Sequence, residues 1–196
     1  MPIPDKMRLF IPAIVPLGLV FSAASVRATT YAPVTFSELV DRAEVIFVGD
    51  VVDVRPYTMR VRDNTIIKTR VTFSVSDPIF GTTSLVEVFD FLGGETGGVG
   101  MAVAGMPTFA IGDRRVVFAR RDRSINPIVG FTQGLLQVRR DDNGVDRVLT
   151  EKGAPLVGPE SIGAFRRGGY AALSSSMRLA DFRGRVAQAL AEAHKK

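Results

Sequence analysis

Residues 43–54 read Ala43-Glu44-Val45-Ile46-Phe47-Val48-Gly49-Asp50-Val51-Val52-Asp53-Val54, an apolar run with one glycine near its middle. So continuous an apolar run predicts a β-strand whose two faces are both covered. A glycine inside a strand costs stability unless the backbone needs it, and the usual need is a bulge or a bend at the corner of a barrel. We therefore predict a strand from Val45 to Val54, bent at Gly49, around which the other strands are arranged.

A short helix is predicted just before this strand. Thr35 and Glu38 have the spacing of a capping box, in which each side chain accepts a hydrogen bond from the backbone N–H of the other residue. The helix then runs to about Ala43 and leads directly into the strand.

Further strands follow at close spacing. Residues 67–76 alternate between apolar and polar side chains, which is typical of a strand with one buried face. Pro56 and Pro78 are predicted to end the first and second strands, because proline cannot donate to a β-ladder, and Arg62-Asp63-Asn64 is predicted to form the turn between them. Asn143-Gly144 predicts a tight hairpin turn near the end of the β-rich region. The remaining strands are predicted over 85–92, 115–119, 127–131, 135–139 and 145–149.

The two ends of the chain differ from this β-rich middle. Residues 1–28 have the order of a secretory signal peptide, with basic residues first, then an apolar run, then a cleavage point after Ala28. A membrane-spanning helix is the alternative, but the apolar run is shorter than the roughly 20 residues that a span needs, and it contains prolines. We therefore expect a secreted or periplasmic protein with no stable membrane anchor after cleavage. Residues 152–174 are predicted to be a Gly/Ser/Arg-rich linker, and residues 175–196 an amphipathic helix.

Together these elements predict a mainly β fold: a small antiparallel β-barrel of OB type over residues 29–151, with a short N-terminal helix and an amphipathic C-terminal helix. A β-sandwich is the alternative arrangement of the same strands. The chain is long enough and apolar enough for one core, because 46% of its residues are hydrophobic.

Several short motifs resemble the netrin/TIMP-like modules, which are built on an OB-type barrel. They are Ala43–Gly49, Phe73–Val75, Ile79–Gly81, Phe109–Gly112 and Val116–Phe118. The Gly-rich loop, the segment Val129–Gly134 and the C-terminal helix also resemble those of exported bacterial proteins of unknown function. The resemblance covers about residues 36–150 and implies a barrel that engages a secreted protease. The inhibitors among these modules chelate zinc through an N-terminal cysteine, whereas residue 29 of this chain is a threonine, so that mechanism does not carry over.

The composition excludes several kinds of chemistry. The chain has no cysteine, so it has no disulfide, no thiolate metal site and no cysteine nucleophile. Its one histidine, His194, is expected to be a solvated residue of the C-terminal tail, which leaves no base for a Ser-His-Asp triad and no histidine for a metal site. The acidic cluster 141–146 lacks the spacing of a calcium loop and is better explained by a hairpin turn. We predict no catalytic residue, no metal and no cofactor.

The charge of the chain gives little information about its partners. The net charge is +5, and without residues 1–28, which hold three basic residues and one acidic residue, it is +3. An arginine cluster could bind an anionic envelope polymer, although a solvated rim is the simpler interpretation; its members are Arg114, Arg115, Arg120, Arg121 and Arg123. Tryptophan is absent and export removes the usual ligand, so we expect no nucleic-acid partner. The oligomeric state is not predicted.

The segment 93–107 is the most unusual in composition, because it is too rich in glycine to be regular throughout. It lacks the lysine and hydroxyl residue of a phosphate-binding loop, and no helix is predicted after it. A partner-facing loop and a purely structural connection both remain open. The candidate partner-binding residues are Gly94, Glu95, Thr96, Gly97, Gly98, Met101 and Met106, with Gly49, Asn143 and Gly144 as structural residues.

Three functions are considered. The leading hypothesis is an exported, non-enzymatic binding module that engages another exported protein, with a secreted protease as the class that the resemblance implies. The second is an envelope hydrolase that uses only carboxylates, for which Glu95, Asp50 or Asp53 would converge in a pocket. The third is a carrier of a small ligand inside the barrel, which conflicts with the large phenylalanines expected to fill the interior.

Overall fold

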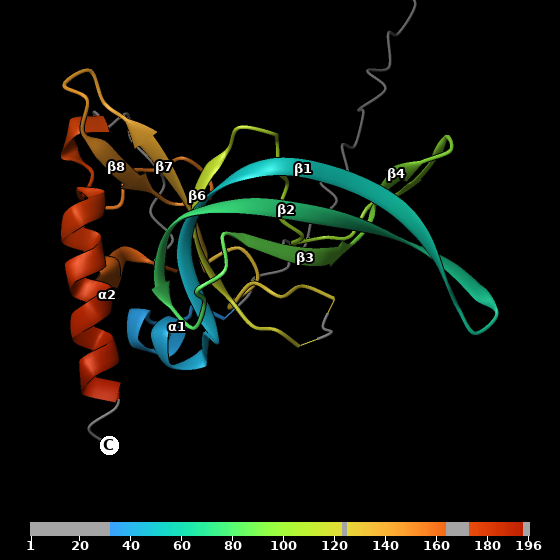
Figure 1. Ribbon diagram of the computed structural model, residues 1–196, viewed down its shortest axis with the longest axis horizontal. Helices are drawn as coiled ribbons and strands as arrows, with labels where there is room; N and C mark the ends of the chain where they lie inside the picture. The colour runs from blue at the N-terminus through green and yellow to red at the C-terminus, as the bar shows by residue number, and fades with distance from the viewer. Residues whose placement is uncertain (1–31, 123–124, 164–172, 194–196) are drawn as a thin grey trace, which may run out of the picture.

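The computed structural model describes residues 32–122, 125–163 and 173–193, and its main feature is a six-stranded antiparallel sheet (Figure 1). The strand order is β3-β2-β1-β6-β7-β8. The bounds are β1 Val45–Val61, β2 Asn64–Phe80, β3 Val86–Leu92, β6 Arg114–Ala119, β7 Leu135–Arg140 and β8 Asp146–Leu149. A separate two-stranded sheet contains β4 Gly94–Thr96 and β5 Val99–Met101.

Two α-helices and two short 3-10 turns complete the described fold. They are α1 Phe36–Arg42, α2 Leu179–Ala193, η1 Pro159–Ser161 and η2 Leu173–Ser175. The predicted fold class is confirmed: a mainly β, antiparallel protein with a short N-terminal helix and a C-terminal helix. Within the described strands the sheet is open, because β3 and β8 form its two edges and do not pair with each other.

The opening strand has the predicted irregularity at its glycine. The register of β1 against β2 shifts between Val48 and Gly49, and again on either side of that point. A Cβ atom added to Gly49 would lie 2.9 Å from the carbonyl oxygen of Ser74 and 3.0 Å from the Phe47 ring. Only glycine allows the two backbones to approach so closely here. The prediction of a bulge at Gly49 is therefore confirmed.

Both faces of β1 are covered, also as predicted, by two separate hydrophobic clusters. Ile46 and Val48 belong to the cluster on the side of the helices, and Val45 and Phe47 belong to the cluster on the other side. Because successive residues of a strand point to opposite faces, an unbroken apolar run is what a strand between two cores requires.

The cluster on the helix side joins α1 and α2 to the sheet. The ring of Phe182 in α2 packs edge-on against Phe118 in β6 and Phe36 in α1, with centroids 6.2 and 5.8 Å away. The capping box of α1 is present, with the Thr35 N–H donating to Glu38 Oε2 over 2.8 Å. The C-terminal helix is thus fixed to the sheet, and the predicted apolar stripe is what it buries.

The second cluster is filled by aromatic rings. Phe47 and Phe89 stack with centroids 6.3 Å apart, and Phe73 lies edge-on to both. Phe47 and Phe73 are completely buried. These rings fill the core on the side of the sheet away from the helices. The sequence predicts such a filled interior from the size of its phenylalanine side chains.

Two predicted strand ends are wrong. β1 continues through Pro56 to Val61, and β2 continues through Pro78 to Phe80. β6 pairs with β1 only as far as Asp50, and β3 pairs with β2 only between residues 68 and 74. Each proline therefore lies where its strand has a partner on one side only, and an edge position tolerates the missing N–H. The predicted turn at residues 62–64 is confirmed as the β1–β2 hairpin.

The predicted strand over 127–131 is also wrong. Ile128 makes an isolated bridge to Ala119, and Gly130 and Phe131 then adopt φ of +65° and +64°. Two successive residues in the left-handed region cannot continue a strand. The other predicted strands are present with ends within one or two residues of those expected.

The C-terminal part of the chain is only partly described. Leu156 and Ile162 fall in the predicted linker, and both are buried in the helix-side cluster. The remaining linker residues 164–172, the predicted signal peptide and His194 lie outside the described residues. Among the helices that the structure describes, none is long and apolar enough to cross a membrane.

Candidate functional site

The Gly-rich segment forms a projecting β-hairpin from β4 and β5 (Figure 1). Thr96 pairs with Val99, so the loop consists of Gly97 and Gly98 alone. Their φ angles are +59° and +75°, and positive φ at both central residues is the requirement of a type I′ hairpin turn. Half of the segment is therefore regular structure, and the glycines at its end are explained by the turn.

The base of this hairpin is fixed to the main sheet. The Gly93 N–H donates to the Ile67 carbonyl over 2.8 Å, and the Thr69 hydroxyl donates to the Gly93 carbonyl over 2.7 Å. Gly94 has a φ of +132°, and a Cβ there would collide with the Thr69 hydroxyl. The hairpin thus leaves β2 in one defined direction.

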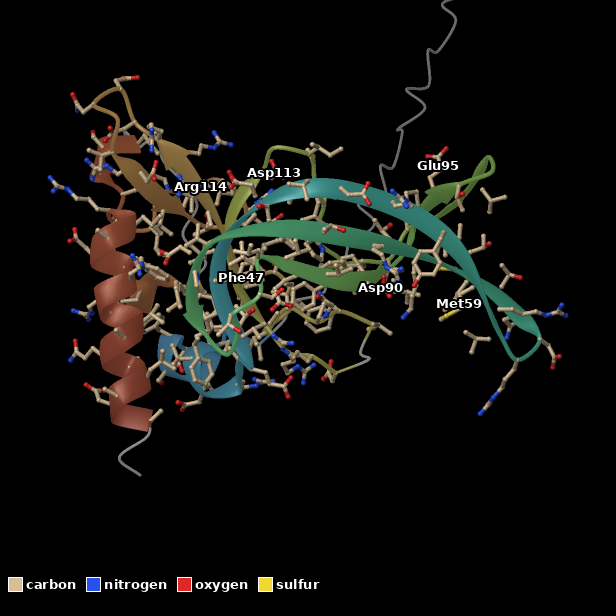
Figure 2. All side chains as sticks on the ribbon, viewed as in Figure 1. Phe47, Met59, Asp90, Glu95, Asp113 and Arg114 are labelled. Carbon is tan, nitrogen blue, oxygen red and sulfur yellow. The ribbon has the colours of Figure 1, made fainter. Side chains whose placement is uncertain are left out.

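The tip of the hairpin is open to solvent and carries an apolar side chain. A Cβ added at Gly97, Gly98 or Gly100 would meet no atom within 4 Å. Val99 is 63% exposed, while Met101 behind it is half-buried. Figure 2 shows Glu95 on the same hairpin, pointing away from the sheet. Of the predicted partner-binding residues, only Met106 lies outside the hairpin, in the loop that follows.

The three carboxylates considered for catalysis lie on two different elements. Asp50 and Asp53 are opposite Ser74 and Thr72 of β2, on the same solvent side of β1. Asp53 also pairs with Arg55 at 3.4 Å, whereas Glu95 stands on the projecting hairpin. The hydrolase hypothesis predicts that these carboxylates converge in a pocket, and Glu95 does not converge with the other two.

The predicted arginine cluster is already paired with acidic side chains. The pairs are Arg114–Asp146 (2.7 Å), Arg115–Asp113 (2.7 Å), Arg120–Asp122 (3.1 Å) and Arg121–Glu87 (2.8 Å), while Arg123 lies outside the described residues. A hydrogen bond from Arg140, assisted by Arg114, lowers the pKa of Asp146. Burial acts to raise the pKa of Asp113, but hydrogen bonds from Arg115 and a backbone N–H outweigh it and lower the pKa. Arg114 joins β6 to β8 and Arg121 reaches Glu87 of β3, while Arg115 and Arg120 pair with acidic residues two positions away, so these four arginines do not form a free cationic patch.

The acidic cluster at the β7–β8 hairpin is likewise structural. Asp141 accepts hydrogen bonds from the backbone N–H groups of Asn143 and Val145, and its other oxygen accepts from Arg147 Nε over 2.8 Å. Hydrogen bonds from Val145 first, and then from Arg147, lower the pKa of Asp141. The predicted Asn143-Gly144 turn is confirmed, with a φ of +75° at Gly144. Within the described residues no group of acidic or histidine side chains could hold a metal ion.

Sequence reasoning missed an open cleft of about 300 Å³ beside β6. It is lined by the N-terminal lead 32–34, the segment 125–133, Arg42 and Arg120. Gln133 ties the first two together, because its Oε1 accepts from the Val34 N–H over 2.9 Å and its Nε2 donates to the Ala32 carbonyl over 3.2 Å. The only sequence indication is the Val129–Gly134 motif, in which a close approach of Gly130 to Val34 explains the first glycine.

Comparison with known proteins adds no identification. No protein-family model and no curated protein matches the chain.

Proposed function

We propose that the protein is an exported, non-enzymatic binding module that engages another exported protein through the tip of the β4–β5 hairpin. The observation that carries this proposal is the exposed Val99 beside a two-glycine turn, on a hairpin whose base is fixed to β2. A fixed base reduces the ordering cost of binding, and an exposed apolar side chain gains free energy when a partner covers it.

The class of partner follows from the proposed export and from the sequence resemblance. Cleavage after Ala28 would place the described domain outside the cytoplasm, where a secreted protease is the partner class that the netrin/TIMP-like resemblance suggests. A protease contact through the hairpin would be steric, because the chain has no cysteine with which to chelate a catalytic metal ion.

The test is recovery of a partner from the culture supernatant of the source organism. Immobilised protein without residues 1–28 is compared with V99D and with V157D, since Val157 is a similarly exposed valine (57%) in the C-terminal segment, outside the hairpin. We expect the unmodified protein and V157D to recover the same protein, and V99D to lose it. Equal recovery by V99D would remove the hairpin from the binding surface.

A further inference from the structure

The outer half of the β1–β2 hairpin is a two-stranded ribbon that projects from the sheet (Figure 1). β6 pairs with β1 only as far as Asp50, β3 pairs with β2 as far as Lys68, and Gly93 donates to the Ile67 carbonyl, so from Met59 and Ile66 outward the two strands pair only with each other. The ribbon ends in the turn after Val61, where Arg62 has a φ of +54°. Figure 2 shows Met59 on this projecting part.

The two faces of the ribbon differ in what covers them. Directly opposite residues share a face, so Ile67 and its partner Thr58 lie on the side that Gly94 of β4 approaches. Ile67 is accordingly 3% exposed. By alternation, the pair Met59–Ile66 and Val61 lie on the opposite face.

The opposite face carries three aliphatic side chains, of which Met59 and Ile66 are half-buried. Val61 is 42% exposed, and neither Met59 nor Ile66 belongs to either hydrophobic cluster. A two-stranded ribbon is marginally stable in water by itself, and covering Val61 together with the accessible parts of Met59 and Ile66 would stabilise it.

Cationic side chains lie on both faces of this end of the ribbon, since Arg60, opposite Thr65, is by alternation on the face of Thr58 and Ile67. Residues 55–70 contain five basic residues and a single acidic one, Asp63. Within the described part of the chain, Arg60 and Arg62 make no hydrogen bond and no ion pair, and both are exposed. Lys68 lies on the same face as Met59 and Ile66, one step nearer the sheet.

We propose that the ribbon docks on an anionic lipid bilayer, with Met59, Val61 and Ile66 entering the interface and Arg60, Arg62 and Lys68 contacting lipid phosphates. Aliphatic residues at a tip flanked by long cationic side chains suit the boundary between acyl chains and anionic headgroups. A soluble anionic polymer would be attracted by the cations, but it offers no apolar layer for the aliphatic residues. The inference is independent of the β4–β5 hairpin, which lies against the other face of the ribbon.

The test is co-sedimentation of the protein without residues 1–28 with two kinds of vesicle: phosphatidylcholine alone, and phosphatidylcholine with one third phosphatidylglycerol. We expect binding to the anionic vesicles only. R60Q/R62Q should weaken it by about 30-fold, from about 1 kcal/mol per cation near an anionic surface.

The decisive variant is M59T/I66T, which keeps every charge and replaces the aliphatic pair by a residue that favours strands. It should also lose vesicle binding, while V88T should not, because Val88 is an exposed valine (48%) on β3, away from the ribbon. Thermal unfolding of each variant checks that the fold is intact. Unchanged vesicle binding by M59T/I66T, or equal binding to neutral vesicles, would overturn the proposal. Heparin binding as tight as vesicle binding, and equally tight in M59T/I66T, would replace it with a polymer site.

Discussion

Gly49 shows how one residue permits a local irregularity in a strand. Its missing Cβ lets β1 approach the Ser74 carbonyl of β2 at the point where the register shifts. The sequence predicts this feature correctly, because a glycine weakens an otherwise unbroken apolar strand and is tolerated there mainly where the backbone bulges or bends.

We expect Gly49→Ala to lower the free energy of unfolding by about 1–3 kcal/mol, since the Ser74 carbonyl and the buried Phe47 ring would have to move. The measurement is the midpoint of denaturant unfolding. Gly184→Ala is the matched control: it lies in the interior of α2 with no atom within 4 Å of an added Cβ, so it should stabilise the protein by up to about 1 kcal/mol. A neutral Gly49→Ala would show that the bulge does not depend on glycine.

At the scale of elements, α2 depends on its docking to the sheet. The stripe of Leu179, Phe182 and Val186 is buried as predicted, while the exposed side of the helix carries Gly184. The sequence could predict the helix and its apolar face, but it could not show what the face packs against, because Phe118 and Phe36 are distant along the chain.

Phe182→Ala should destabilise the protein by about 3–5 kcal/mol, as expected for the loss of a fully buried ring between two others. Leu190→Ala, at a half-buried position of the same helix, should cost clearly less. Hydrogen exchange should show faster exchange throughout α2 in the Phe182 variant, and protection equal to that of the unmodified protein would contradict the docking role.

The ends of β1 and β2 could not be predicted from the sequence. Proline predicts a strand end at residues 56 and 78, yet both strands continue because β6 and β3 have already ended beside them. Whether an N–H is needed depends on which neighbour is present, and that is fixed by tertiary pairing. The β4–β5 hairpin is not predicted either. The glycines of this segment suggest irregular structure, although a Gly-Gly turn with positive φ is a regular hairpin connection.

At the scale of the whole molecule, ion pairs tie together elements far apart in sequence. Arg147 of β8 holds Asp141 and also donates to the Ser176 carbonyl over 2.9 Å, just before α2. Arg114 of β6 reaches Asp146 of β8 across β7. None of these pairings follows from the sequence, in which the arginines form an apparent cluster.

These pairings predict an acid-sensitive fold. The pKa values of Asp113, Asp141 and Asp146 are lowered in the folded protein, so their contribution to stability is present above the unfolded value of about 3.9 and is lost as the pH falls through the lowered values. The denaturation midpoint should therefore decline below about pH 4. D146N should show a lower midpoint at neutral pH and a shallower decline in acid, and an identical pH profile would exclude a role for this pair.

The candidate site could be predicted in part. Glycine content singles out residues 93–107, and six of the seven predicted partner-binding residues lie on the β4–β5 hairpin. Val99, its most exposed apolar residue, is not among them, because exposure depends on where the turn falls. The sequence groups Asp50, Asp53 and Glu95 only because each carries a carboxylate, and folding separates Glu95 from the other two.

The most direct test of the proposed binding role is site-specific photo-crosslinking from residue 99 in the intact protein, exposed to the proteins of the culture supernatant. Leu85, which is 79% exposed and immediately precedes β3, is the comparison position. The proposal predicts one dominant cross-linked protein from position 99 that is missing from position 85. The same products from both positions, or none from position 99, would contradict a partner-binding hairpin.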